Sequence, residues 1–131
     1  MREILFRGKT KHGGEWVYGG VCCSAGNTII VSFSERILTT IEGKRVLPET
    51  VGQYTGLTDK NGKKIFEGDI LEFSDRIVVV FWHTHLGCWG CNFLKFTNKE
   101  NGRDDMSPHS WGYRSEVIGN IHDNPELLKG E

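Results

Sequence analysis

Residues 51–70 read VGQYTGLTDKNGKKIFEGDI, and this stretch decides the fold. The Asn61-Gly62 pair lies between two short segments of mixed polarity, and it favours a tight β-hairpin turn because it tolerates positive φ at both central positions. A second turn is predicted at Glu67-Gly68. Asp59 and Asp69 stand beside these turns, where aspartate carboxylates accept hydrogen bonds from backbone amides. The stretch therefore predicts consecutive antiparallel strands.

Strand signals continue on both sides of this stretch. Alternating or clustered β-forming residues predict further strands at 3–6, 15–23, 28–33, 45–47, 77–83 and 116–121. The segment 77–83 is a continuous apolar run rich in β-branched residues, which is typical of a buried central strand. Residues 124–128 predict a short C-terminal helical turn, with Asn124 as its cap, Pro125 in its first turn and Gly130 as its stop.

The composition agrees with one mainly β domain. The chain has 131 residues, of which 37% are hydrophobic and 25% charged, values that are ordinary for a soluble globular domain. Seventeen glycines and only three prolines favour many turns between short strands over long helices. We expect a single domain over residues 1–131.

The charge and the apolar pattern restrict the cellular setting. A formal net charge of −1 gives no general attraction to nucleic acid or to an anionic membrane. No basic stripe is evident, since Lys60, Lys63 and Lys64 fall in a predicted hairpin turn. The chain has no apolar run of membrane-spanning length, and residues 1–7 are too short and too charged for a secretion signal. We expect a cytoplasmic protein without membrane association, whose cysteines are reduced.

Three stretches carry a resemblance to a known family: MREILFRG at 1–8, PETVGQYTGLTDKNGKKIFEGDI at 48–70 and EVIGNIHDNPELL at 116–128. Together they resemble the YopX family of bacteriophage and prophage proteins. The resemblance implies a small barrel-like, SH3-like β core, a phage origin and therefore a bacterial host cell. It implies no established activity, cofactor or catalytic residue. The segment 71–113 lies outside the resemblance.

The segment 83–91 holds a candidate metal site with the pattern H-x-H-x2-C-x2-C. His83 and His85 would share one face of a strand, and a C-x2-C turn can bring the thiolates of Cys88 and Cys91 to one point, a ligand set that suits zinc. All four residues lie within nine positions, whereas structural zinc sites usually join two separated pairs. We favour the alternative that the cysteines pack as small apolar residues, so no cofactor is assigned. A thioredoxin-like redox site is a third interpretation, without the expected βαβ context.

Catalytic patterns are weak. Neither of the two common glycine-rich phosphate motifs occurs. Glu67 and Asp69 could form a pair of carboxylates, but turn positions favour capping or solvated acids. Ser107, His109 and Ser110 fall in a polar segment that offers no buried base. We therefore do not predict an enzyme.

A binding function is the remaining prediction. The segment 97–112 is long and polar, and aromatic residues close to a loop on a β scaffold often form binding surfaces. We predict a non-catalytic protein-binding or self-assembling module, whose partner is a phage protein, a host protein or a second copy. The predicted partner-binding residues are Trp89, Arg103, Trp111 and Tyr113. The four tryptophans leave single-stranded nucleic-acid binding as an alternative, which the charge does not favour.

Overall fold

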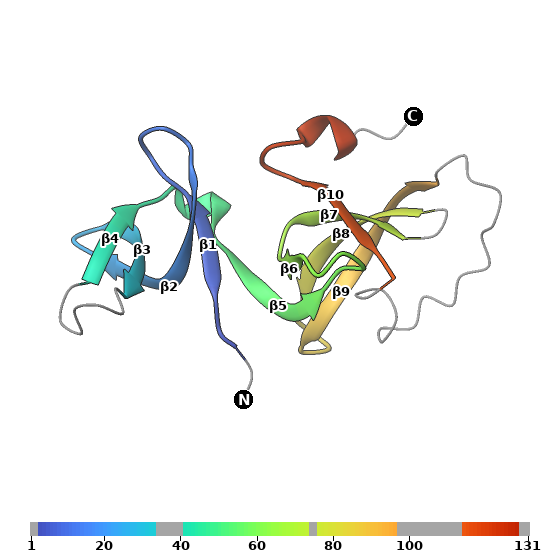
Figure 1. The fold of residues 1–131 in the computed structure, drawn as a ribbon, viewed down its shortest axis with the longest axis horizontal. Coiled ribbons are helices and arrows are strands. Elements are labelled where there is room, and N and C mark those ends of the chain that lie inside the picture. The colour runs from blue at the N-terminus through green and yellow to red at the C-terminus, as the bar shows by residue number, and fades with distance from the viewer. Residues whose placement is uncertain (1–2, 34–40, 74–75, 97–113, 129–131) are drawn as a thin grey trace. The chain divides into compact units, whose positions relative to one another are not determined.

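The computed structural model describes residues 3–33, 41–73, 76–96 and 114–128 (Figure 1). The chain divides into two compact units, Met1–Tyr54 and Thr55–Glu131, which are described one at a time. The prediction of one YopX-like domain over the whole chain stays a prediction.

The first unit is an antiparallel sheet with the strand order β4-β3-β2-β1-β5. Its strands are β1 (Phe6–Lys9), β2 (Trp16–Ser24), β3 (Asn27–Phe33), β4 (Ile41–Arg45) and the beginning of β5 (Gly52–Thr58). A short 3₁₀ helix, η1 (Pro48–Thr50), joins the region after β4 to β5. Among the described residues of this unit, the buried apolar side chains are Ile30, Val46 and Tyr54.

The second unit contains the rest of β5, β6 (Lys64–Phe66) and a four-stranded antiparallel sheet with the order β10-β7-β8-β9. The strands of that sheet are β7 (Asp69–Phe73), β8 (Arg76–His83), β9 (Cys88–Phe96) and β10 (Glu116–Asn120). They are the green to red strands that lie side by side in Figure 1. A 3₁₀ helix, η2 (Pro125–Leu128), follows β10.

The core of the second unit is built from alternate residues of its strands. Ile65, Leu71, Val78 and Val80 form a cluster with at most 2% of each residue exposed. Val78 and Val80 are two positions apart in β8 and share a face, as strand geometry requires. In the strand order, β8 has β7 on one side and β9 on the other, so the predicted strand at 77–83 lies inside the sheet.

The mainly β prediction is confirmed, and the only helices among the described residues are the two short 3₁₀ turns. The order of the described strands is open in both units, so the predicted barrel-like, SH3-like closure is not confirmed. The first and fourth strands lie at Phe6–Lys9 and Ile41–Arg45, whereas the sequence indicated 3–6 and 45–47. Strand β9 was not predicted. Its two cysteines were interpreted as small apolar residues that pack after the end of the strand at 77–83. Residues 34–40 and Gly130 lie outside the described residues.

The hairpin turn at Asn61-Gly62 differs from the predicted type. Gly62 has a φ of +81°, but Asn61 is not among the residues with positive φ, so the turn is not type I′. The Gly62 N–H donates to the Asp59 carbonyl, and the Asp59 N–H donates to the Lys63 carbonyl. This is the longer hairpin loop that ends with a glycine in the left-handed region. Two successive residues with positive φ occur instead at Gly13-Gly14, between β1 and β2, and at Ala25-Gly26, between β2 and β3.

The segment around η2 is organised by two asparagine side chains. The Asn120 Oδ1 atom accepts the N–H groups of His122 and Asp123, which forms the turn after β10. The Asn124 Oδ1 atom accepts the Asn120 N–H at 3.2 Å, so this side chain turns back to β10. The predicted helical turn is present, but the Asn124 side chain does not cap it as predicted. Only its carbonyl does so, by accepting the Leu127 N–H.

Candidate functional site

The candidate site lies on the β8–β9 hairpin of the second unit, which contains all four residues of the candidate metal site and Trp89. The register pairs His83 with Cys88 and Trp82 with Trp89, across a turn at residues 84–87. Directly paired residues of an antiparallel ladder point to the same face. One face of the hairpin therefore carries Val80, Trp82, Trp89 and Cys91, and the opposite face carries His83 and Cys88.

The first of these faces continues from the core to the surface. Val78 and Val80 are buried in the core cluster, and Trp89 and Cys91 pack against it from the partner strand. One position further along β8 on the same face, Trp82 is 45% exposed. Its ring meets the Trp89 ring edge-on, with 5.0 Å between the centroids. This edge-to-face geometry is favourable for aromatic rings and fixes Trp82 in place while leaving nearly half of it open to solvent.

Two further exposed apolar side chains belong to the same hairpin. Phe93 pairs with Val78 in the register and is 50% exposed, and Leu86 in the turn is 71% exposed. Large apolar residues that gather on one surface of a small protein mark an interaction site more often than single exposed ones do. We name Trp82, Trp89 and Phe93, which the register places on one face of the β8–β9 ladder, the aromatic face.

Of the two histidines of the candidate metal site, His83 stabilises the hairpin turn. The His83 Nδ1 atom accepts the Leu86 N–H at 3.2 Å, and the His83 carbonyl accepts the Gly87 N–H at 2.8 Å. One ring nitrogen of His83 is thus already engaged. The His85 side chain is exposed, and its ring centroid lies 6.3 Å from that of His83.

The two cysteines of the candidate metal site point in different directions. Cys88 and Cys91 are three positions apart in the extended strand β9, so they lie on opposite faces of the sheet. Cys88 is exposed opposite His83, whereas burial beside Val80 raises the pKa of the Cys91 thiol to about 12. Within the described parts of the chain, no three His, Cys, Asp or Glu side chains converge on one point. Zinc binding at these residues therefore stays the alternative interpretation, and the described geometry does not favour it.

The predicted turn residues fill structural positions. The Asp59 carboxylate accepts three backbone N–H groups. Asp69 Oδ2 accepts the Phe66 N–H at 2.8 Å, a donor before the turn, whereas the sequence indicated amides after Gly68. Gly68 lies in the turn between β6 and β7 with a φ of +87°. Both aspartates are buried, at 4% and 1% exposure. Their carboxylates therefore maintain the fold of the second unit.

Three of the four predicted partner-binding residues, Arg103, Trp111 and Tyr113, lie outside the described residues; the fourth, Trp89, belongs to the aromatic face. Trp82, a further member of this face, was not among the predicted site residues. A signal was available, since a turn at 84–87 would place Trp82 opposite Trp89. Its exposure could not be predicted, because the hydrophobic pattern of 77–83 continues unbroken from the core.

No helix in the described ranges has the length and apolar character needed to cross a membrane.

Comparisons with known proteins give a family and a fold. The family model described as YopX protein matches residues 5–129. The crystal structure of protein EF1440 from Enterococcus faecalis is similar, with a TM-score of 0.57 and 25% sequence identity. The similarity covers 98% of this chain and 100% of that one. None of the curated proteins matches this chain.

Proposed function

The chain belongs to the YopX family, and we propose that it is a non-catalytic protein-binding module that acts in the cytoplasm of a phage-carrying bacterium. The observation that supports this proposal is the exposure of Trp82, on the same sheet face as the buried Val80. A protein that only needed to fill its core would gain nothing by extending that face with a half-exposed tryptophan. Aromatic side chains held rigidly at a surface supply much of the affinity of protein interfaces.

The chemistry of strand β9 favours an extended protein segment as the partner. In the order β10-β7-β8-β9 it is the edge strand, it has nine residues, and it carries one formal charge, at Lys95. Edge strands usually carry several charges, a proline or a bulge to prevent pairing with other chains, and β9 has only a bulge opposite the step from Ile77 to Val78. An added strand would gain backbone hydrogen bonds and place its alternate apolar side chains beside the aromatic face.

Site-specific photo-crosslinking in phage-carrying cells tests the proposal. A benzophenone amino acid replaces Trp82 in one version of the protein and Tyr18 in a second. Tyr18 is the matched control, because it is an aromatic residue of the first unit with 49% exposure. We expect a cross-linked phage or host protein from position 82 and none from position 18. The partner, identified by mass spectrometry and purified, should then reproduce the crosslink with the pure protein.

Two surface variants extend this experiment. Phe93→Lys adds a charge to the aromatic face and should abolish the crosslink at position 82, whereas Val21→Lys, at a 37% exposed position of the first unit, should leave it unchanged. Equal crosslinking at both benzophenone positions, or a crosslink that survives Phe93→Lys, contradicts the proposal. A cross-linked product with the mass of two copies of this chain would show that the partner is a second copy and not another protein.

A further inference from the structure

The first unit presents aromatic and cationic side chains on one face of its sheet. The register pairs Lys9 with Trp16 and Arg7 with Tyr18, and directly paired residues of an antiparallel ladder point to the same face. Residues two positions apart in a strand also share a face. Strands β1 and β2 therefore place these four residues together, and we name Arg7, Lys9, Trp16 and Tyr18 the basic-aromatic face.

Two cations hold the ring of Trp16. The guanidinium carbon of Arg7 lies over the ring, 4.6 Å from its centroid, and the Lys9 ammonium lies 5.6 Å from the same centroid. Both distances are in the range of cation–π attraction. Arg7 is only 6% exposed, so it supports the tryptophan from inside the unit. Trp16 is partly exposed, and its accessible surface belongs to the side that Arg7 does not cover.

Tyr18 extends this aromatic surface. It lies two positions after Trp16 on the same face, and 49% of it is exposed. An aromatic side chain that is open to solvent can stack with any nucleic-acid base, because every base has a π face. The bases of a duplex are stacked on each other, whereas unpaired bases are free to stack on protein side chains. The two aromatic residues therefore fit single-stranded nucleic acid better than a duplex.

Strand β4 adds a further cation at the edge of this face. Thr10 forms an isolated antiparallel bridge with Val46, which is 1% exposed. A Cβ at Gly8 would lie 3.0 Å from the Val46 side chain, so these residues share the buried face. Successive residues of a strand point to alternate faces. Lys9 and Arg45 therefore lie together on the opposite, outer face.

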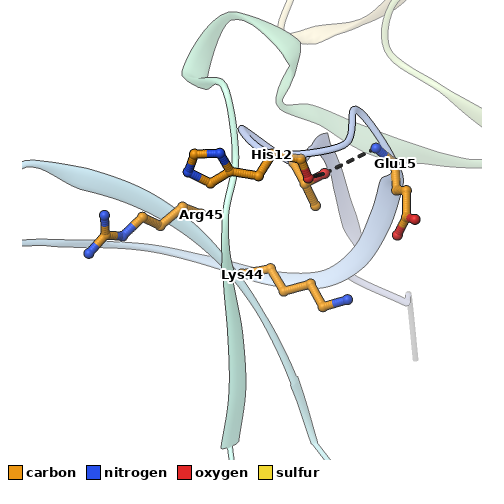
Figure 2. Close-up of a pocket in the computed structure, with 5 residues that line it drawn as sticks. His12, Glu15, Lys44 and Arg45 are labelled. Carbon is orange, nitrogen blue, oxygen red and sulfur yellow. Dashed lines mark hydrogen bonds between the residues drawn. The ribbon is translucent and has the colours of Figure 1, made fainter.

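The charge of this surface complements a phosphate backbone. Strand β1 and residues 16–20 of β2 contain no acidic residue. Figure 2 shows the exposed Arg45 side chain extending away from Lys44 and from the carboxylate of Glu15. A nucleic-acid strand repeats its negative charge at every nucleotide, so it can contact cations that are spread over a surface. The net charge of −1 for the whole chain does not reveal this local arrangement.

We propose that the basic-aromatic face, together with Arg45, binds single-stranded nucleic acid. Trp16 and Tyr18 stack with bases, and Lys9 and Arg45 contact backbone phosphates. Stacking and phosphate contacts do not read base edges, so binding should have little sequence preference. This surface belongs to the first unit, whereas the aromatic face proposed to bind protein belongs to the second.

Fluorescence anisotropy with the full-length protein tests the proposal. The probes are fluorescein-labelled strands of about 15 nucleotides, oligothymidylate as DNA and oligouridylate as RNA, and a labelled DNA duplex of the same length. At about 50 mM salt we expect a Kd between about 1 and 100 μM for a single strand, and at least about tenfold weaker binding of the duplex. The tighter single strand identifies DNA or RNA as the preferred ligand. Since Lys9 and Arg45 would neutralise two phosphates, a plot of log K against log salt concentration should have a slope of about −1.4.

Matched variants locate the site. Arg45→Gln should weaken binding and halve the salt slope, whereas Lys44→Gln, at the neighbouring residue that points the other way in Figure 2, should change neither. Tyr18→Ala should weaken binding at least about fivefold through the loss of a stacked base, and Tyr18→Phe should retain it. The denaturation midpoint of each variant, measured without nucleic acid, establishes that it is folded.

Several results would overturn the proposal. They are the absence of binding by both single strands, duplex binding as tight as that of a single strand, unchanged affinity in Tyr18→Ala, or equal affinity of the folded Arg45→Gln and Lys44→Gln proteins. A protein cross-linked to benzophenone at position 18 would assign this face to a protein partner instead. Arg45→Gln should leave the crosslink at position 82 unchanged, so the two proposals fail separately.

Discussion

The Oδ2 atom of Asp59 accepts a hydrogen bond from the Val117 N–H at 3.0 Å, although these residues are 58 positions apart in the chain. The Oδ1 atom accepts the N–H groups of Asn61 and Lys63, both at 2.9 Å. One carboxylate therefore closes the hairpin turn and also attaches it to strand β10. A further contact supports the same attachment, since the Lys60 N–H donates to the Ser115 carbonyl.

Asp59→Asn is expected to destabilise the protein by about 1–3 kcal/mol at neutral pH, because the amide presents an N–H₂ group to at least one of these backbone donors. Chemical denaturation measures this loss. Glu49→Gln, at an exposed carboxylate of η1, is the control and should have little effect. A denaturation midpoint equal to that of the unmodified protein would show that the contact to Val117 contributes nothing.

The pH dependence of stability should contain a contribution from Asp59. Burial acts to raise the pKa of Asp59, but the backbone N–H groups of Val117, Lys63 and Asn61, with the charge of Lys63, hold it below the ordinary 3.8. Since the folded pKa lies below the unfolded one, the stabilisation is present above the unfolded pKa and is lost as the pH falls through the folded pKa. The free energy of unfolding, measured down to about pH 2.5, should fall less steeply in Asp59→Asn. An unchanged slope would contradict this account.

Gly62→Val is expected to cost about 1–3 kcal/mol, because a β-branched residue must adopt the φ of +81° that closes the hairpin. Gly20→Val is the matched control. Gly20 has no positive φ, and nothing lies within 4 Å of the position that its Cβ would take. If both variants unfold at the same denaturant concentration, the left-handed residue at position 62 is not required.

Gly119→Ala tests the packing between β10 and the segment before η2. A Cβ at Gly119 would overlap the Oδ1 atom of Asn124, the same atom that accepts the Asn120 N–H. We expect a loss of about 1–3 kcal/mol from this overlap. The loss should be smaller in an Asn124→Ala background, and a double-mutant cycle measures the difference. Additive effects of the two substitutions would exclude the proposed clash.

The four cysteines should differ in reactivity. Burial raises the pKa of Cys91 to about 12, whereas Cys22, Cys23 and Cys88 are exposed. Because the thiolate is the reactive form, iodoacetamide at about pH 8 should label Cys91 at least about tenfold more slowly than the other three. Mass spectrometry of the peptides gives the rates, and the difference should disappear in denaturant. Equal labelling in the native protein would show that Cys91 is not protected.

The purified protein should carry far less than one zinc per chain, and a chelator should not change its denaturation midpoint. His83 uses one ring nitrogen in the hairpin turn, and Cys88 and Cys91 lie on opposite faces of β9. Elemental analysis tests this expectation. Stoichiometric zinc, lost together with stability on chelation, would establish His83, His85, Cys88 and Cys91 as a site.

The sequence by itself determined the elements whose signals are local. The β-branched run at 77–83 became the interior strand β8, because β-branched apolar side chains favour a strand that buries much of its surface. Asp59 and Gly62 were predicted at a hairpin turn, since turn chemistry acts over four or five residues. The YopX resemblance rested on three stretches, and two of them contain the turn and asparagine contacts described above.

The tertiary structure decided everything that depends on pairing between distant strands. Strand register placed Cys88 and Cys91 on opposite faces, and it set Trp82 beside Trp89 at the surface. The β1–β2 turn lies against the end of β4, where the Lys11 N–H donates to the Arg45 carbonyl across 34 positions of the chain. Local propensity contains no information on which strands pair or where a sheet stops, because those choices depend on burial summed over the whole fold. The proposed binding surface on the β8–β9 hairpin arises from such choices.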